Sequence, residues 1–286
     1  MAVHRRGYRR YQGPLTGRWS RLMVTPRFAW ERLAGQRLVV LFLAVSMIWP
    51  LLCAAFVYVA NHSELWAGLA PGLRNFLRVD DRFFLVFMGF QAVPAVVLAA
   101  LTGPGLVAPD LANNGLQLYF SRPLSRTDYV LARLVVLMGI LSLITWAPGL
   151  ALFGMQAGMA GWKWFTANWQ LGLGVTAGFL MWVLIVSLVA LASSAYVRWR
   201  LVAGGLVLGF FFVLGGVAEM VNGIFRVTWG TLLNPSRAAH RIWCSMLGVE
   251  PPAGPGTPEC VAALAVLVLL LVVVLERKLR PVEVIS

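Results

Sequence analysis

Charged side chains are scarce in this sequence, and lysine is almost missing from it. Charged residues make up 12% of the chain, about half the fraction that is typical of a soluble domain. Neither Lys163 nor Lys278 lies in a G-x-x-x-x-G-K-[ST] motif, so the sequence has no P-loop for ATP. The histidines His4, His62 and His240 are too far apart to suggest a metal cluster. We therefore expect this chain to bind no nucleotide, cofactor or metal, and to have no catalytic residue.

Acidic residues are nearly missing from the long apolar segments. A charge at the centre of a membrane helix costs about 2.5–3.5 kcal/mol on insertion scales, so ion-driven carriers keep such residues for function. Glu219 is the one acidic candidate, and its place at the end of an apolar segment favours an anchor near the outer interface over proton coupling. The G-x-S-x-G and H-E-x-x-H motifs are missing as well. These absences make a secondary carrier, a channel, an enzyme or a non-transport membrane assembly factor the weaker alternatives.

Apolar residues, by contrast, make up 59% of the chain and come in long blocks. A membrane span needs about 20 mainly apolar residues, because each adds 1.5 Å of helix across about 30 Å of hydrocarbon. Six blocks reach this length: 38–60, 83–101, 129–153, 169–197, 201–222 and 258–276. Pro148 predicts a kink near the end of the third. The predicted fold class is an all-α membrane protein, with a six-helix transmembrane domain over residues 38–286.

Basic residues are divided unequally between the two sides that six spans would create. Seventeen of the 24 fall on the same side as the N-terminus, nine of them before residue 38, and seven fall on the other side. The positive-inside rule therefore predicts that both termini are cytoplasmic. The net charge of +13 then reflects topology and contact with lipid headgroups rather than a nucleic-acid partner.

Residues 1–37 form an arginine-rich arm on the cytoplasmic side, followed by an amphipathic segment. Thr25 and Pro26 suit the cap and first turn of a helix that runs to Arg37. Apolar and charged residues alternate in it with the spacing of a helix that lies in the membrane interface. This segment is either an elbow helix that positions the first span or an ordinary juxtamembrane anchor.

The connection over residues 105–128 is too long for a simple cytoplasmic turn. A short helix is predicted to start near Pro109 and Asp110, with Leu111, Gly115, Leu118 and Tyr119 on one face. Pro123 then breaks the helix ahead of the third span.

The sequence of residues 110–129, DLANNGLQLYFSRPLSRTDY, resembles the cytoplasmic segment of ABC-2 type permeases. That segment has an acidic residue, a few polar positions, a glycine, an apolar run, S-R-P-[LI]-S-R and an aromatic residue that enters the next span. The chain length, the six spans, the elbow and the long loop before the last span are also similar to this family. Pro109, directly before the acidic residue, and the arginine-rich arm depart from the pattern.

The resemblance implies the membrane-spanning subunit of an ATP-driven exporter in the bacterial cytoplasmic (inner) membrane, of the type V exporter kind. Two copies would pair as a homodimer and bind two separate ATPase subunits, which would hold the ATP and Mg. The segment over residues 105–128 would be the coupling helix that contacts the ATPase. Its contact residues would be Asp110, Gly115, Tyr119, Arg122, Pro123 and Arg126. The alternative is that the two arginines only anchor the cytoplasmic side.

The outer loop over residues 223–257 is similar to the family region whose short helices dip back into the outer leaflet. Asn234, Pro235 and Trp243 are the candidate outer gate. Cys244 and Cys260 would both lie on the oxidising side, either as a disulfide or as two free thiols. By resemblance, the translocation route would lie near the first, second and fifth spans. Its candidate lining residues are Trp49, Phe87, Gln91 and Phe211.

Overall fold

A computed structural model describes residues 18–62, 78–107, 126–197 and 199–278 of the chain. The described residues form helices, turns and loops, and none of them forms a strand. Six helices are long and apolar enough to cross a membrane: Arg37–Asn61, Asp81–Val107, Thr127–Ala160, Trp162–Tyr196, Arg200–Phe225 and Thr257–Lys278. Each overlaps one of the six predicted spans, which confirms the prediction of a multi-pass helical membrane protein.

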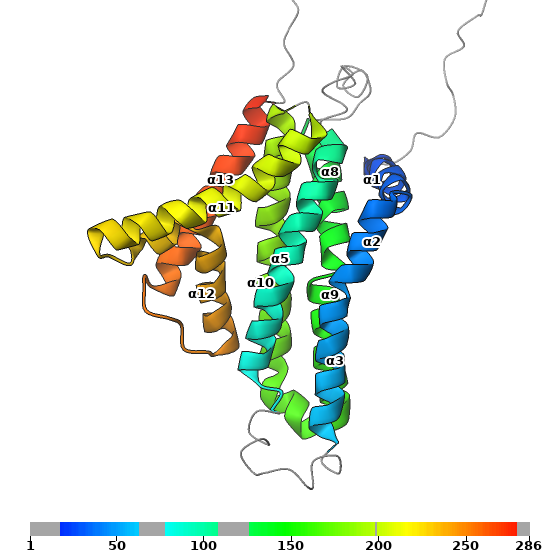
Figure 1. Ribbon diagram of the computed structural model, residues 1–286. Helices are drawn as coiled ribbons and strands as arrows, with labels where there is room; N and C mark the ends of the chain where they lie inside the picture. Colours follow the sequence, from blue (N-terminus) through cyan, green and yellow to red (C-terminus); the bar gives the residue numbers. More distant parts are fainter. Residues whose placement is uncertain (1–17, 63–77, 108–125, 198, 279–286) are drawn as a thin grey trace, which may run out of the picture.

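Figure 1 shows the helices in chain order. They are α1 (Arg18–Ala34), α2 (Arg37–Ser46), α3 (Ile48–Asn61), α5 (Asp81–Thr102), α8 (Arg126–Ser142), α9 (Trp146–Ala160), α10 (Trp162–Tyr196), α11 (Arg200–Phe225), the 3-10 helix η2 (Trp229–Leu233), α12 (Pro235–Leu247) and α13 (Thr257–Lys278). Helices α2 and α3 together form the first span, and α8 and α9 form the third.

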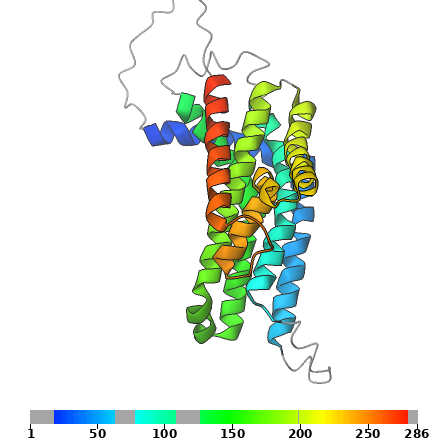
Figure 2. The same cartoon turned by 90° about the vertical axis from the view of Figure 1, so that its left-hand side faces the viewer.

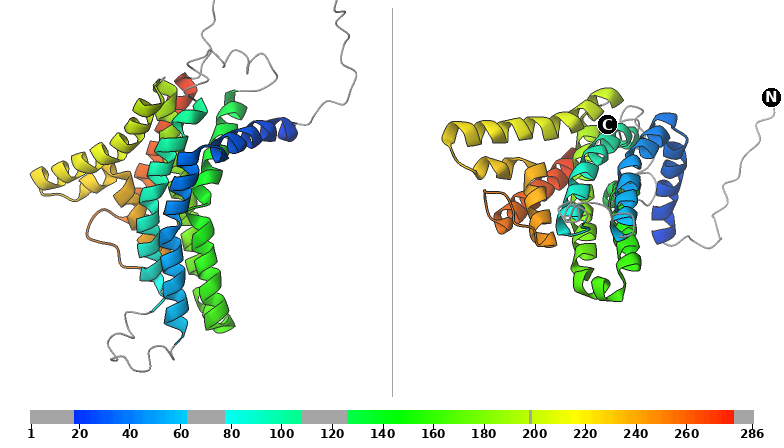
Figure 3. Two further views of the ribbon diagram at one scale, coloured as in Figure 1. Left: turned by 45° about the vertical axis from the view of Figure 1, so that its right-hand side comes forward. Right: turned by 60° about the horizontal axis from the view of Figure 1, so that its bottom comes forward.

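Helix α1 lies across one end of the bundle, which we call the α1 end (Figures 2 and 3). It packs on α8, where Trp30 lies so close to Gly139 that a Cβ there would come within 2.5 Å of the indole ring. The prediction that this helix starts at Pro26 and runs to Arg37 is wrong, because α1 covers Arg18–Ala34. Pro26 lies inside it, where the helix gives up one backbone hydrogen bond.

The third span is bent, as the sequence predicts, but the bend precedes its proline. Helix α8 ends at Ser142 and α9 begins at Trp146, with a tight turn between them. Pro148 has no N–H for the carbonyl of Ile144, so the regular hydrogen-bond pattern cannot pass through this turn. Helix α9 then continues to Ala160, seven residues beyond the predicted end of the span.

Helix α10 is the centre of the bundle and packs against α5, α8, α9, α11, α12 and α13. Because lipid tails are as apolar as leucine, close packing rather than hydrophobic burial must hold these helices together. Gly178 of α10 provides such an approach, since a Cβ there would lie 2.7 Å from both Met88 and Trp243. The rings of Phe87 and Phe179 meet edge to face at 5.9 Å, next to the fully buried Met88.

Helix α11 leaves the bundle at a steep angle, and η2 and α12 return beneath it (Figures 1 and 3). Several of its apolar side chains are uncovered, as at Phe212, which is 84% exposed. Figures 1 and 2 place the corner between α11 and α12 between the two ends of the bundle rather than beyond its far end. The short helices of the outer loop therefore lie beside the spans.

Candidate functional site

The residues predicted to contact an ATPase lie almost entirely outside the described residues. Residues 108–125, which include Asp110, Gly115, Tyr119, Arg122 and Pro123, belong to that part of the chain. Arg126 is the first residue of α8. The segment joins the end of α5 to the start of α8, so any force on it acts on these two helices.

The four candidate lining residues differ in how far they are buried within one copy of the chain. Phe87 and Gln91 are fully buried inside the bundle, and Trp49 is half-buried and stacks on Phe90 with the ring centres 4.5 Å apart. Phe211 lines a cavity of about 610 Å³ together with Trp182. The route was expected near the first, second and fifth spans where two copies meet, so the lining role of these four residues stays a prediction.

Gln91 has a structural role that its polarity alone does not reveal. Its Nε2 donates a 3.0 Å hydrogen bond to the carbonyl of Ser46, where α2 gives way to α3. Pro50 lies four residues after Ser46 and has no N–H, so this carbonyl has lost its usual helix donor. Gln91 supplies the missing donor from the neighbouring span, as backbone groups at membrane depth require.

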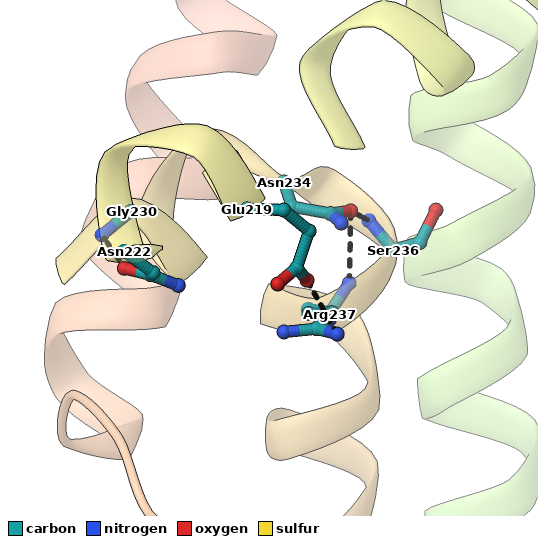
Figure 4. A network of polar contacts seen from close by, with 6 residues as sticks. All are labelled: Glu219, Asn222, Gly230, Asn234, Ser236 and Arg237. Carbon is teal, nitrogen blue, oxygen red and sulfur yellow. Dashed lines mark hydrogen bonds and ion pairs between the residues drawn. The ribbon is translucent and has the colours of Figure 1, made fainter. Parts of the chain in front are cut away.

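A polar network joins the end of α11 to η2 and α12 (Figure 4). Asn234, one of the candidate gate residues, caps α12 by accepting from the N–H groups of Ser236 (3.0 Å) and Arg237 (3.2 Å). Arg237 forms a 2.5 Å ion pair with Glu219 of α11, and both side chains are 54% exposed. Pro235 is the first residue of α12, where a missing N–H costs nothing. Glu219 is thus an ion-pair partner of the outer loop.

Asn222 fixes the 3-10 helix η2 in the same corner. Its Oδ1 accepts a 2.8 Å hydrogen bond from the N–H of Gly230. A Cβ on Gly230 would lie 2.4 Å from the carbonyl oxygen of Ala218, so only glycine fits there. The sequence contains no motif that would predict the contact between Asn222 and Gly230.

Trp243, the third candidate gate residue, is 2% exposed and held inside the bundle. Its Nε1 donates a 3.0 Å hydrogen bond to the carbonyl of Gly178 in α10. Its ring also meets that of Trp182 edge to face at 5.9 Å. The side chain anchors α12 to α10, and any movement of α12 would have to break these contacts.

Arg241 of α12, one of the seven basic residues on the side opposite the N-terminus, has a buried side chain. It is 7% exposed, and its guanidinium donates to the carbonyls of Pro252 and, at 3.3 Å, Gly254. These bonds hold the loop before α13 against α12. In the sequence, only the neighbouring apolar residues Ile242 and Trp243 indicate that Arg241 is buried. Its bonding partners Pro252 and Gly254 could not be identified without the structure.

All three cysteines are buried, free thiols. The structure therefore does not contain the Cys244–Cys260 disulfide that the sequence leaves open. Burial raises the pKa of the Cys244 thiol, and the nearby positive charge of Arg241 offsets part of that rise. Burial also lowers the pKa of His240, whose Nδ1 lies 3.7 Å from the Cys244 sulfur, which favours a neutral imidazole at pH 7.

Arg200 joins three elements at the α1 end of the bundle. Its Nη2 donates to the side chain of Gln36 at 2.7 Å and to the carbonyl of Leu101 at 3.3 Å. Gln36 lies between α1 and α2, Leu101 lies in the last turn of α5, and Arg200 is the first residue of α11. The position of α11 is thereby linked to the hinge between α1 and α2.

A polar cavity of about 680 Å³ lies at the opposite, far end. Asn61 and Gln156 meet in its wall through a 2.6 Å hydrogen bond that joins α3 to α9. Asp80, also in the wall, caps α5 by accepting from the N–H of Phe83 at 3.0 Å. Asn61 and Gln156 are therefore bonded to each other, and Asp80 is bonded to the backbone of α5.

The described residues contain no group of three or more histidine, cysteine or acidic side chains that could hold a metal ion. No protein-family model matches the chain, and no curated protein matches it in sequence. Among the described residues, the arrangement consists of helix junctions, an ion pair and cavities between spans.

Proposed function

We propose that this chain is the membrane-spanning permease subunit of an ATP-driven ABC exporter. The observation that supports this most is the outer loop, whose helices η2 and α12 lie beside the spans between α11 and α13. Non-helical backbone beside membrane spans is tolerated only where protein or water covers it. Such a loop is therefore costly to place there, which favours a functional role for it. A loop that reaches into the membrane can open or close a path between the spans.

Two further features support the same proposal. The sequence of residues 110–129 is similar to the ATPase-contacting segment of ABC-2 permeases. Helix α1, packed across the bundle end against α8, has the position that an elbow helix takes in such a subunit. Seventeen of the 24 basic residues fall on the same side as the N-terminus, which favours cytoplasmic termini. By resemblance to ABC-2 permeases, the membrane is the bacterial cytoplasmic one.

The energy source must come from another chain, because the sequence has no P-loop. Two ATPase subunits, carrying ATP and Mg, would bind a homodimer of this permease through residues 105–128. Since this segment joins α5 to α8, closure of the ATPases would move these two helices. Arg200 would pass the movement to α11 through its bonds to the end of α5 and the α1–α2 hinge.

A charge reversal in the coupling segment tests this function. The chain, affinity-purified in mild detergent from its native membrane, should carry along a P-loop subunit and ATP hydrolysis that vanadate inhibits. The double variant Arg122→Glu with Arg126→Glu should insert normally and lose both. Lys163→Glu, an exposed charge reversal at the far end, should keep both.

Two results would overturn the proposal. One is equal ATPase recovery with the double variant and with wild-type chain. The other is solute movement by the isolated chain in liposomes without nucleotide, which would support a secondary carrier or channel instead.

A further inference from the structure

Two cavities of about 610 Å³ each lie end to end along α5 and α11. The first lies at the α1 end between α2, α5 and α11, and the second continues along α5 towards α12. Val97 and Leu208 line both of them, so the two cavities share a wall on each side. We call the combined hollow the α5–α11 groove.

The groove is apolar along its length and polar at its two ends. Leu38, Leu101 and Leu201 belong to the walls at the α1 end, and Val93, Phe211 and Phe212 to those of the second cavity. None of the described residues that line the groove is acidic. An occupant must therefore be apolar over most of its length.

The arginines at the two ends of the groove differ in whether an acidic side chain neutralises them. Arg237, at the α12 end, is neutralised by its 2.5 Å ion pair with Glu219. At the α1 end, Arg37 and Arg200 both line the groove, and Arg200 uses one nitrogen for Gln36 and Leu101. Two guanidinium groups without an acidic residue in the same wall favour an anionic group, above all a phosphate.

The length of the groove matches one leaflet. Its lining residues on α5 run from Gly89 to Leu101, a stretch of roughly 18 Å because each of the twelve steps between them adds 1.5 Å. Half of a hydrocarbon core of about 30 Å is similar in depth. The two arginines lie at the end where α1 marks the membrane interface, so the charged and apolar parts have the order of a lipid.

We propose that the α5–α11 groove binds one phospholipid with an anionic headgroup from the leaflet at the α1 end. The phosphate lies at Arg37 and Arg200, and one acyl chain lies between α5 and α11 towards Phe211. The site belongs to this chain alone and does not depend on an ATPase partner.

Two glycines of α11 provide a matched pair of variants. Gly205 lines the groove and Gly209, one turn later, does not, and a Cβ at either would meet nothing within 4 Å. Gly205→Phe therefore fills the groove without a backbone clash, while Gly209→Phe adds the same side chain outside it. An acyl chain that has to make room for the added ring loses packing worth about 1–3 kcal/mol, which weakens its binding about tenfold.

Native mass spectrometry of the full chain in detergent can count bound lipid. Phosphatidylglycerol should give one retained adduct per chain, and phosphatidylcholine or inorganic phosphate should give none at the same concentration. Gly205→Phe should weaken the adduct about tenfold, because the added ring takes the place of part of the acyl chain, and Gly209→Phe should leave it unchanged. Equal binding by the two glycine variants, or equal binding of the two lipids, would overturn the proposal.

The headgroup contact has its own test, since Arg200 also supports the helix junction. Arg37→Gln should weaken phosphatidylglycerol about fivefold, the value expected for one arginine near a membrane surface. Arg27→Gln on α1, whose partner is Glu31 at 3.4 Å, is the control and should not change it. An unchanged affinity of Arg37→Gln for phosphatidylglycerol would show that Arg37 does not bind the headgroup, and would overturn this part of the proposal.

Discussion

Gln91 donates a hydrogen bond of 3.0 Å to the carbonyl of Ser46, the one carbonyl of the first span that Pro50 leaves without its helix donor. The amide thus completes the backbone of a neighbouring helix and keeps the break between α2 and α3 in one geometry. A polar residue in a span need not mark a transport path, because it can serve a broken helix instead.

The bond between Gln91 and Ser46 predicts that replacing Pro50 reduces the cost of losing Gln91. Gln91→Leu should destabilise the chain by about 1 kcal/mol, because the Ser46 carbonyl then has no donor. In a Pro50→Ala background the alanine N–H can bond that carbonyl, so the same change should cost much less. Unfolding in detergent, compared over the double-mutant cycle, measures the difference. Equal costs in the two backgrounds would show that the Gln91 bond does not replace the helix donor.

The ion pair between Glu219 and Arg237 predicts a second non-additive result. Both side chains of the pair are 54% exposed at the α11–α12 corner beside the bundle, so removing one partner leaves the other charge unpaired at the surface of the chain. Glu219→Gln or Arg237→Gln alone should therefore lower stability by up to about 1 kcal/mol. The double variant should cost less than either single change. A double variant as unstable as the sum of both would mean that each side chain acts separately.

Arg241 should control how firmly the loop before α13 is held. Arg241→Gln removes the bonds to the carbonyls of Pro252 and Gly254, so hydrogen exchange and proteolysis should rise over residues 248–256. Charge-assisted bonds of this kind contribute about 1.5–3 kcal/mol, which corresponds to at least about tenfold faster exchange if opening is local. Arg226→Gln, on an exposed side chain beyond α11, is the control and should leave the loop unchanged.

The sequence was a good guide where structure follows from local composition. The six spans could be predicted because each apolar block is long enough by itself to cross a bilayer. The prediction that α1 starts at Pro26 was wrong because proline is typical of a first turn but can also lie inside a helix where tertiary packing tolerates it. The roles of Gln91 and Arg241 needed the partners Ser46 and Pro252, which lie in other elements and which spacing alone does not identify.

The cysteines provide the last prediction, which decides between two free thiols and a disulfide. The structure holds Cys53, Cys244 and Cys260 as buried free thiols, so the denatured chain should titrate three thiols without reductant. In the folded chain, burial limits the access of a thiol reagent to Cys244 and, by raising its pKa, lowers its thiolate fraction, so the reagent should modify it slowly at pH 7–8. Because the pKa is raised, its reactivity should still be increasing at a pH where an ordinary thiol has levelled off. A titre of one thiol per denatured chain would show instead that Cys244 and Cys260 are paired, and tryptic mapping without reductant would then find their two peptides joined.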